Sequence, residues 1–374
     1  MLTPESRLQD FSSLSNRSYF NTAAEGIPPA TVLEALRQYG EDKLLGMAGR
    51  ARHEKVWEAA RVELAYAYGL STEEVSFCSC SSEAFNLAAL ALQLQEGDEV
   101  IINDLDFPAG ATPWLQESCP ATVKVWKSRD YILDPADLKE LLSPRTRLVT
   151  TSLVSFFNGF KIDLPAVREI VRDNSNALLA LDVTQALGRI PLDLNDVDLI
   201  ISSTHKWILA SHGGGLVGVP KHRETEWTVP AGGWFNLQNA FEADRFERTV
   251  TKKGAASFSV GMPNYPAIYP IRAGLEYIRK SSVTAIDEYC RPLVEHCYAE
   301  LQKLDVNLLT PASPASRAGI IAFTHPDAER IYQQLLKEEI HVMYHAGRLR
   351  IAIHGYNTAE DLERLLATLH TALN

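Results

Sequence analysis

Asp182 and Lys206 follow two short apolar segments, and their side chains together suit covalent chemistry on an amine. The first segment, residues 177–181, ends directly at Asp182. The second, residues 197–201, is followed by small hydroxyl residues and then by His205 and Lys206. Short, predominantly apolar segments between turn signals are typical of neighbouring buried strands in a parallel sheet. Because ligands of open α/β sheets bind beyond the carboxyl ends of strands, both side chains are expected in one crevice.

A lysine and a carboxylate in one crevice meet the needs of pyridoxal phosphate. This cofactor requires a lysine amine for its Schiff base and a carboxylate against its pyridine nitrogen. The carboxylate keeps that nitrogen protonated, so that the ring can accept the electrons of a substrate carbanion. A buried ion pair is the alternative explanation for the pair taken alone. We predict Lys206 as the attachment point and general base, and Asp182 as the second catalytic residue.

The neighbours of this pair have a specific spacing, D-x-x-Q…S-x-H-K-W. The pattern resembles that of the class V aminotransferase and cysteine desulfurase family of pyridoxal-phosphate enzymes. The resemblance implies that the following residues bind the cofactor: Asp182, Gln185, Ser203, His205 and Lys206.

A turn of small residues at 78–83, after the strand predicted at 75–77, is a candidate phosphate site. A helix is predicted over 84–94, and the amides and dipole of a helix N-terminus favour anions, although plain N-capping is the alternative. In the resembling family this segment reads G-T-T-E-x-x-N and holds the cofactor phosphate. The resemblance therefore assigns Ser81 and Ser82 to the phosphate, although cysteine replaces the usual glycine at position 80.

Two aromatic residues follow the next predicted strands, at 99–103 and 147–154. The resemblance implies that Phe107 stacks on the pyridine ring, whereas an ordinary core cap is the alternative. Desulfurases have a histidine there, and a phenyl ring can stack but cannot transfer protons. Phe156 departs from the family's asparagine, which reaches the 3-oxygen of the cofactor. That contact is then made by Gln185 or is missing.

Residues near both ends of the chain are candidates for substrate binding. An arginine six residues before Tyr-Asn-Thr matches the family's R-x-x-x-x-x-Y-N-T and assigns Arg350 to the substrate carboxylate, because its planar fork of donors matches two oxygens. Arg348 lies on the same strand face and is the second candidate, with a solvated arginine as the alternative. The family's Tyr-x-Asn-x-Ala segment places Asn21 in the substrate pocket, with an ordinary turn as the alternative. Thr358 is expected to cap the last helix, with Asp361 as its partner.

Strands and helices alternate from about residue 75 to 205, which is typical of a βαβ series and a mostly parallel sheet. A chain of 374 residues exceeds the size at which one core stops growing, so two lobes are expected. The resemblance implies an α/β protein of fold type I, with a large doubly wound domain and a smaller C-terminal α+β domain. We predict an N-terminal arm at 1–20 that packs with the small domain, a cofactor-binding domain at 21–260 and the small domain at 261–374.

Composition excludes several other classes of protein. An apolar content of 46% describes an ordinary globular protein, and a net charge of −11 argues against nucleic acid and anionic membranes as partners. The first residues lack the basic and apolar regions of a secretory signal, and no run reaches membrane-spanning length, so a cytoplasmic protein is expected. No disulfide framework and no metal site are expected, because the five cysteines are scattered and form no CxxC pair.

Two glycine-containing segments bear on the cofactor and on the subunit arrangement. Residues 213–218 fit G-x-G-x-x-G, but they lead into a predicted strand and not into a helix, so a nicotinamide cofactor is rejected. Residues 261–264 resemble the family's G-T-P-N, which a neighbouring subunit lends to the phosphate, with Met262 in place of the threonine. The resemblance implies a homodimer with the active site near the subunit interface.

These residues predict an enzyme that acts on the α-carbon of an amino acid, most simply a class V aminotransferase. A carbon–sulfur or other β-lyase, or an epimerase, is the alternative, because the motifs do not determine the fate of the carbanion. A catalytically silent binding protein is the alternative outside enzymes. A cysteine desulfurase is not expected, because residues 340–349 lack the thiol that would carry a persulfide.

Overall fold

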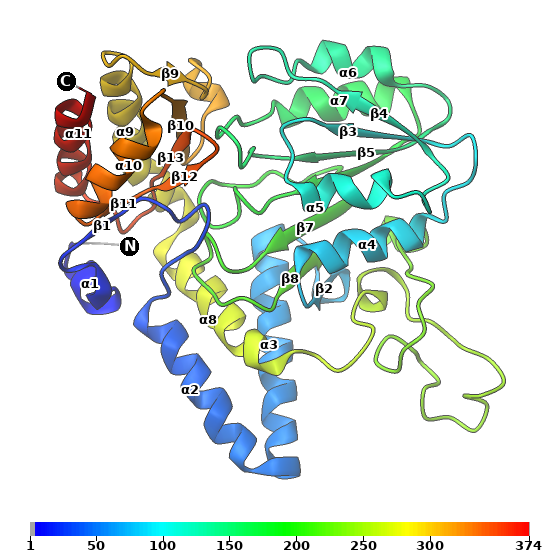
Figure 1. The fold of residues 1–374 in the computed structure, drawn as a ribbon. Coiled ribbons are helices and arrows are strands. Elements are labelled where there is room, and N and C mark those ends of the chain that lie inside the picture. The colour runs from blue at the N-terminus through cyan, green and yellow to red at the C-terminus, as the bar shows by residue number, and fades with distance from the viewer. Residues whose placement is uncertain (1–3, 374) are drawn as a thin grey trace.

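The structure, a computed structural model, describes residues 4–373 and has two lobes (Figure 1). The larger lobe is built on a seven-stranded sheet with the order β2-β8-β7-β6-β5-β3-β4. The strands are β2 (Val75–Cys78), β3 (Glu99–Asn103), β4 (Thr122–Trp126), β5 (Thr146–Ser152), β6 (Leu178–Asp182), β7 (Leu199–Ser203) and β8 (Gly215–Gly218). Only β8 runs antiparallel to its neighbours, so the predicted mostly parallel sheet is confirmed.

The central strands are apolar on both faces because helices cover both faces of the sheet. Alternate residues of β6 and β7 lie in two separate apolar clusters: Leu179 and Ile200 face one side, and Ala180 and Leu199 face the other. The first side packs against α3 (Arg50–Tyr68), α6 (Pro135–Leu141) and α7 (Leu164–Asn174). The second packs against α4 (Ser81–Leu92) and α5 (Pro108–Ala111). Strands buried on both faces are the rule in parallel sheets, and this explains why these segments read as continuous apolar runs.

The register of the central strands brings their polar ends together. Asp182 is the last residue of β6 and pairs with Ser152 of β5 and Ile201 of β7. Lys206 follows three residues after the end of β7. The predicted adjacency of the two strand ends is confirmed, because β6 and β7 are paired neighbours.

The smaller lobe contains a four-stranded antiparallel sheet with the order β12-β13-β10-β9. Its strands are β9 (Asn307–Leu308), β10 (Ile320–Thr324), β12 (Met343–His345) and β13 (Arg348–Ala352). The helices of this lobe are α9 (Val283–Leu301), α10 (Ala328–Lys337) and α11 (Ala359–Leu373). The long helix α8 (Tyr265–Ser281) packs against α2 (Ala30–Leu44) and α3 of the large lobe and leads into α9.

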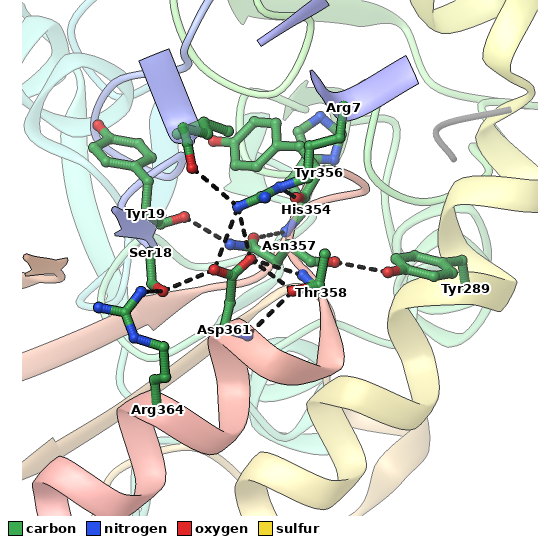
Figure 2. A network of polar contacts seen from close by, with 11 residues as sticks. Arg7, Ser18, Tyr19, Tyr289, His354, Tyr356, Asn357, Thr358, Asp361 and Arg364 are labelled. Atoms are coloured by element: carbon green, nitrogen blue, oxygen red, sulfur yellow. Dashed lines mark hydrogen bonds and ion pairs between the residues drawn. The ribbon is translucent and has the colours of Figure 1, made fainter. Parts of the chain in front are cut away.

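The N-terminal segment is held by the small lobe. Strand β1 (Ser18–Tyr19) pairs in parallel with β11 (Ile340–His341), and Arg7 of α1 (Pro4–Asp10) forms an ion pair with Asp361 at 3.0 Å. Figure 2 shows that Asp361 also accepts a hydrogen bond from the hydroxyl of Ser18. The expected cap of α11 is confirmed, since the hydroxyl of Thr358 accepts from the amide of Asp361.

Short 3-10 helices occupy several connections: η1 (Ser12–Leu14), η2 (Gly46–Gly49), η3 (Thr72–Glu74), η4 (Thr112–Leu115), η5 (Lys221–Arg223), η6 (Gly254–Ser257) and η7 (Pro314–Ser316). No helix within residues 4–373 is both long enough and apolar enough to cross a membrane.

Candidate active site

Lys206 lies on the connection between β7 and β8 and is only 9% exposed. The N-terminal segment closes over the backbone of this connection: the amide of Gly26 donates to the carbonyl oxygen of His205 at 2.7 Å. A Cβ atom on Gly26 would lie 2.0 Å from the carbonyl oxygen of Lys206, so only glycine permits this approach. The backbone at His205 and Lys206 is therefore held by close contact with Gly26.

The environment of Lys206 favours a neutral amine. Burial lowers the pKa of this lysine to about 8, and the positive charge of Arg350 acts in the same direction. The carboxylate of Asp182 opposes both effects. Burial disfavours the charged form of a lysine, and a neutral amine is the form that attacks a carbonyl carbon.

Asp182 is buried at the end of β6 and is oriented by its neighbours. Its Oδ1 accepts the amide of Thr184 at 2.7 Å, and the hydroxyl of Thr184 accepts the amide of Ser203 at 3.0 Å. Burial raises the pKa of Asp182, whereas the bonds from Thr184 and the charge of Lys206 lower it. A buried carboxylate of this kind is well suited to hold a proton on a ligand nitrogen.

Two histidines stack at the entrance of this connection. The rings of His205 and His212 are 4.3 Å apart between centroids, and Nε2 of His212 lies 2.8 Å from Oε2 of Glu25. Burial, followed by the charge of Lys206, lowers the pKa of His205 to about 4. His205 is therefore a neutral imidazole at pH 7.

The side chain of Gln185 is hydrogen-bonded within the described chain, whereas the hydroxyl of Ser203 is not. The side chain of Gln185 is engaged within the protein, because Oε1 accepts from the indole of Trp207 at 2.7 Å and Nε2 donates to the carbonyl oxygen of Ala23 at 3.0 Å. The hydroxyl of Ser203 is buried and has no partner among the described residues. Trp207 and Gln185 thus tie the lysine connection to the N-terminal segment, while Ser203 keeps a free hydroxyl.

The predicted phosphate turn forms the start of α4. Cys80 is the N-cap, and its sulfur accepts the amide of Glu83 at 3.4 Å. Ser81 and Ser82 occupy the first two helical positions, where backbone amides have no partner within a helix. Gly215 of β8 packs on this turn: a Cβ atom there would lie 2.3 Å from the carbonyl oxygen of Cys80. The glycines that imitate a dinucleotide fingerprint therefore permit a close approach of β8 to the turn.

The aromatic ring of Phe107 lies near the amine of Lys206 and contacts the ring of Phe156. Nζ of Lys206 lies 5.2 Å from the ring centroid of Phe107, which is 43% exposed. The rings of Phe107 and Phe156 are 5.0 Å apart and nearly perpendicular. Phe107 thus presents a ring face next to the amine, as stacking on a planar cofactor requires.

Strand β13 brings two arginines toward the large lobe. Arg350 is 3% exposed and donates through Nη1 to the carbonyl oxygen of Phe156 at 2.7 Å, while its Nε has no partner among residues 4–373. Burial and the charge of Arg348 lower the pKa of Arg350 to about 10. Asn21 forms a bridge with Ala352 of the same strand, and its buried Oδ1 also has no partner in the described chain.

Asp106 is a residue near the site that sequence reasoning missed. It accepts from the side chain of Asn103 and from the amide of Ser152, both at 2.8 Å. Burial raises its pKa to about 7, and the charge of Asp182 adds to the rise. Its place just after β3, next to Phe107, is the signal that identifies it in the sequence.

The residues present fit pyridoxal phosphate. Several of the buried polar atoms that lack a partner within the described chain belong to predicted site residues: the hydroxyl of Ser203, the amide oxygen of Asn21 and the Nε atoms of Arg348 and Arg350. Buried polar groups are normally hydrogen-bonded, so free ones around a buried lysine indicate a polar ligand. A helix N-terminus for a phosphate, an aromatic face and a carboxylate complete the set that this cofactor needs.

The family assignment agrees with this geometry. The family model described as aminotransferase class V matches residues 18–365, so the chain belongs to the class V aminotransferase family. Enzymes of this family use pyridoxal 5′-phosphate, and the predicted cofactor is confirmed at that level.

Relatives support the same family, and a solved structure shows the same fold. A cysteine desulfurase of Synechococcus elongatus is 30% identical over 94% of this chain, which spans only 60% of that relative's length. An uncharacterized aminotransferase of Bacillus subtilis, YcbU, is 26% identical over 97% of this chain and 96% of its own. The structure of a cysteine desulfurase from Thermococcus onnurineus NA1 superimposes with a TM-score of 0.89 at 21% identity, over 100% of this chain and 98% of its own. The predicted fold class is thereby confirmed.

Proposed function

We propose that this protein is a pyridoxal-phosphate-dependent aminotransferase that acts on the α-carbon of an amino acid. The observation that carries the proposal is the buried amine of Lys206 beside Asp182, with Arg350 close enough to influence its charge. When bound, the cofactor supplies a conjugated ring that accepts the electron pair left by the Cα proton.

Each catalytic step that the chain itself performs has a residue suited to it. Lys206 would hold the cofactor through its amine and would take the proton from Cα as general base, because its lowered pKa leaves about half of the free amine neutral at pH 8. Asp182 holds a proton on the pyridine nitrogen. Ser81, Ser82, Ser203 and His205 are proposed to bind the cofactor, and Phe107 to cover one face of its ring.

Gln185 has a narrower role than the resemblance implies. Its oxygen and one donor are already bonded to Trp207 and Ala23, so we propose that only its second amide hydrogen faces the cofactor. Asn21 and Arg350 are proposed to bind the substrate. Arg350 holds the α-carboxylate because Phe156 fixes one end of the guanidinium and leaves Nε free.

Persulfide chemistry is not part of this proposal, although several relatives are named as cysteine desulfurases. The segment that would carry the thiol forms β11, β12 and the tight turn at Gly347 before β13, and it holds no cysteine. Cys78, Cys290 and Cys297 are buried, and burial raises the pKa of each thiol. Cys119 is half-buried, and Cys80 is exposed but its sulfur caps α4 by accepting the amide of Glu83. A buried thiol does not form the thiolate that attacks sulfur.

We further propose a cytoplasmic homodimer without nucleic-acid or membrane partners, with the active site near the subunit interface. Large apolar side chains that stand in solvent in the single chain support this assembly: Leu44, Met47, Phe241 and Phe246 are 87%, 79%, 79% and 91% exposed. Met262, predicted to face the partner's phosphate site, is 45% exposed. Sedimentation equilibrium that gave the mass of a monomer at micromolar concentration would refute the dimer.

Product analysis of the purified holoenzyme with a panel of amino acids tests the proposed reaction. Transamination forms a keto acid and converts the cofactor to its amine form without release of ammonia. Release of ammonia together with the keto acid would indicate the β-lyase, and loss of optical activity alone would indicate the epimerase.

Cysteine as a substrate tests the exclusion of persulfide chemistry. We expect no persulfide on the enzyme after turnover, and any sulfide should appear with pyruvate and ammonia. Stoichiometric alanine, abolished by replacing any one of the five cysteines, would show that the protein is a desulfurase.

A further inference from the structure

Four arginines are buried in the described part of the chain, and they fall into two kinds: Arg189, Arg317, Arg348 and Arg350. Arg189 forms an ion pair with Asp287 at 3.0 Å, and Arg317 forms one with Glu295. Arg348 and Arg350 form no ion pair with any residue in 4–373, and the Nε of each has no partner. Buried charges are costly unless they are paired. Arg189 and Arg317 are therefore neutralised by acidic partners, whereas Arg348 and Arg350 remain two buried cations that are unpaired within the described chain.

The two unpaired arginines share one face of β13. Residues two apart on a strand point to the same side, and their Cα atoms are about 6–7 Å apart. The residues between and after them, Leu349 and Ile351, face the apolar core of the small lobe. The arginine face is turned to the large lobe, as shown by the bond from Arg350 to the carbonyl oxygen of Phe156.

Arg348 is held in place by aromatic rings. Its guanidinium lies 4.0 Å from the ring centroid of Phe157 and 5.8 Å from that of Phe156. Stacking on a ring face uses the π surface of the guanidinium and leaves the N–H donors at its edge free for an anion. The aromatic rings therefore orient the guanidinium group of Arg348 without neutralising its positive charge.

Two like charges this close repel each other, and one substrate carboxylate balances only one of them. The mutual effect is visible in Arg350, whose pKa is lowered by burial and also by the charge of Arg348. A second anionic group on the ligand would remove this penalty. No acidic side chain in residues 4–373 forms an ion pair with either guanidinium.

We infer that the substrate is an amino acid with an anionic side chain: Arg350 holds the α-carboxylate and Arg348 holds the second anion. This inference rests on the proposed function. It gives Arg348 a role that selects the substrate and leaves the Cα chemistry to Lys206. Carboxylate, sulfinate and sulfonate side chains share the required chemistry.

Binding of unreactive probes to the holoenzyme tests the inference without turnover. Succinate and glutarate have two carboxylates, whereas butyrate has one, and calorimetry measures the affinity of each. We expect a dicarboxylate to bind about tenfold more tightly or better than butyrate, since each charge-assisted pair adds to affinity. Equal affinities of mono- and dicarboxylates for the wild-type enzyme would overturn the inference.

Two variants separate the roles of the arginines. Arg348→Gln should abolish the preference for dicarboxylates over butyrate, because the affinity for the dicarboxylates falls more than that for butyrate, whereas Arg350→Lys should weaken both probes. Arg348→Lys keeps a positive charge and should retain part of the preference for dicarboxylates. This variant provides the test if Arg348→Gln does not fold. Arg330→Gln, at a 59% exposed site on α10, is the matched control and should change neither. A full dicarboxylate preference in Arg348→Gln would refute the role of Arg348.

Turnover identifies the second anion and keeps this inference separable from the proposed function. Aspartate, glutamate and cysteine sulfinate should be converted faster than alanine or leucine in the wild type, with the advantage lost in Arg348→Gln. If neutral amino acids are converted as fast as acidic ones, the inference fails and the proposed function stands. If the cofactor is not attached to Lys206, the proposed function fails first.

Discussion

At the scale of single residues, the site is a balance between burial and charge around one amine. Burial and Arg350 favour the neutral form of Lys206, and Asp182 favours the charged form. The carboxylate is itself destabilised by burial, which raises its pKa. The titrations of Lys206 and Asp182 are therefore coupled, so that replacing either residue should shift the pKa of the other.

The titration of Lys206 in cofactor-free protein is a direct consequence of this balance. Labelling with acetic anhydride, mapped by mass spectrometry, should show a midpoint near pH 8 for Lys206. Lys221 is the internal control, because its pKa is raised by its hydrogen bond with Glu224. In Asp182→Asn the midpoint of Lys206 should move to lower pH, since the attraction that raises its pKa is gone. A midpoint for Lys206 at or above that of Lys221 would contradict the described environment.

Sequence patterns alone predicted charged residues that the structure brings together, but they did not predict the hydrogen bonds of every side chain. Lys206, Asp182 and Arg350 were accessible to prediction because each falls at a strand end or in a spaced motif. The engagement of Gln185 with Trp207 and Ala23 was not, because it depends on how the N-terminal segment crosses the lysine connection. The sequence also did not predict that Arg348 is buried without an ion-pair partner among the described residues, because a solvated arginine and a buried one cannot be distinguished from the residue type alone.

At the scale of elements, the approach of β8 to the start of α4 determines the shape of the phosphate turn. Strand β8 pairs with β2 on one side and β7 on the other, so it lies directly beneath the turn that leaves β2. Gly215 of β8 lies in close contact with the backbone of Cys80, so the position of the strand limits the position of the turn. The sequence predicted the strand and the helix, but not their contact, because the two segments are distant in the chain.

Gly215→Ala should disturb this contact. The added Cβ meets the carbonyl oxygen of Cys80 at 2.3 Å, so the backbone of one segment has to shift. We expect a loss of about 1–3 kcal/mol in the free energy of unfolding, as is typical of overpacking, together with weaker binding of pyridoxal phosphate. Denaturant unfolding and cofactor titration measure the two effects. Gly232→Ala is the control, since nothing lies within 4 Å of its Cβ, and equal behaviour of the two variants would contradict the described contact.

Element boundaries show where local patterns stop being informative. The strand expected at 147–154 ends at Ser152. The amide of Leu153 still donates to the carbonyl oxygen of Asp182 at the end of β6, but Val154 pairs with Lys161 outside the sheet. The helix expected from residue 84 begins at Ser81, because the hydroxyl residues of the turn enter its first turn. The end of the strand thus depends on pairing with other segments, whereas the start of the helix depends on the local cap by Cys80.

At the scale of the whole molecule, the two lobes meet over the crevice and the N-terminal segment joins them. Arg7 and Ser18 bond to Asp361 of the small lobe (Figure 2). In the large lobe, Gly26 donates to His205 of the lysine connection, and Ala23 accepts from Gln185. No local pattern predicts an ion pair between residues separated by most of the chain. The family resemblance predicted the two-lobed fold, because its motifs are distributed over both lobes.

Reduction of the holoenzyme with borohydride, followed by peptide mapping, tests the central claim most directly. Reduction fixes the cofactor on the lysine that holds it, and the described site predicts a single adduct on Lys206. Lys161 and Lys252, which lie outside the β7–β8 connection, should remain unmodified and are the internal controls. An adduct on another lysine, or none on Lys206 in protein saturated with pyridoxal phosphate, would contradict the account.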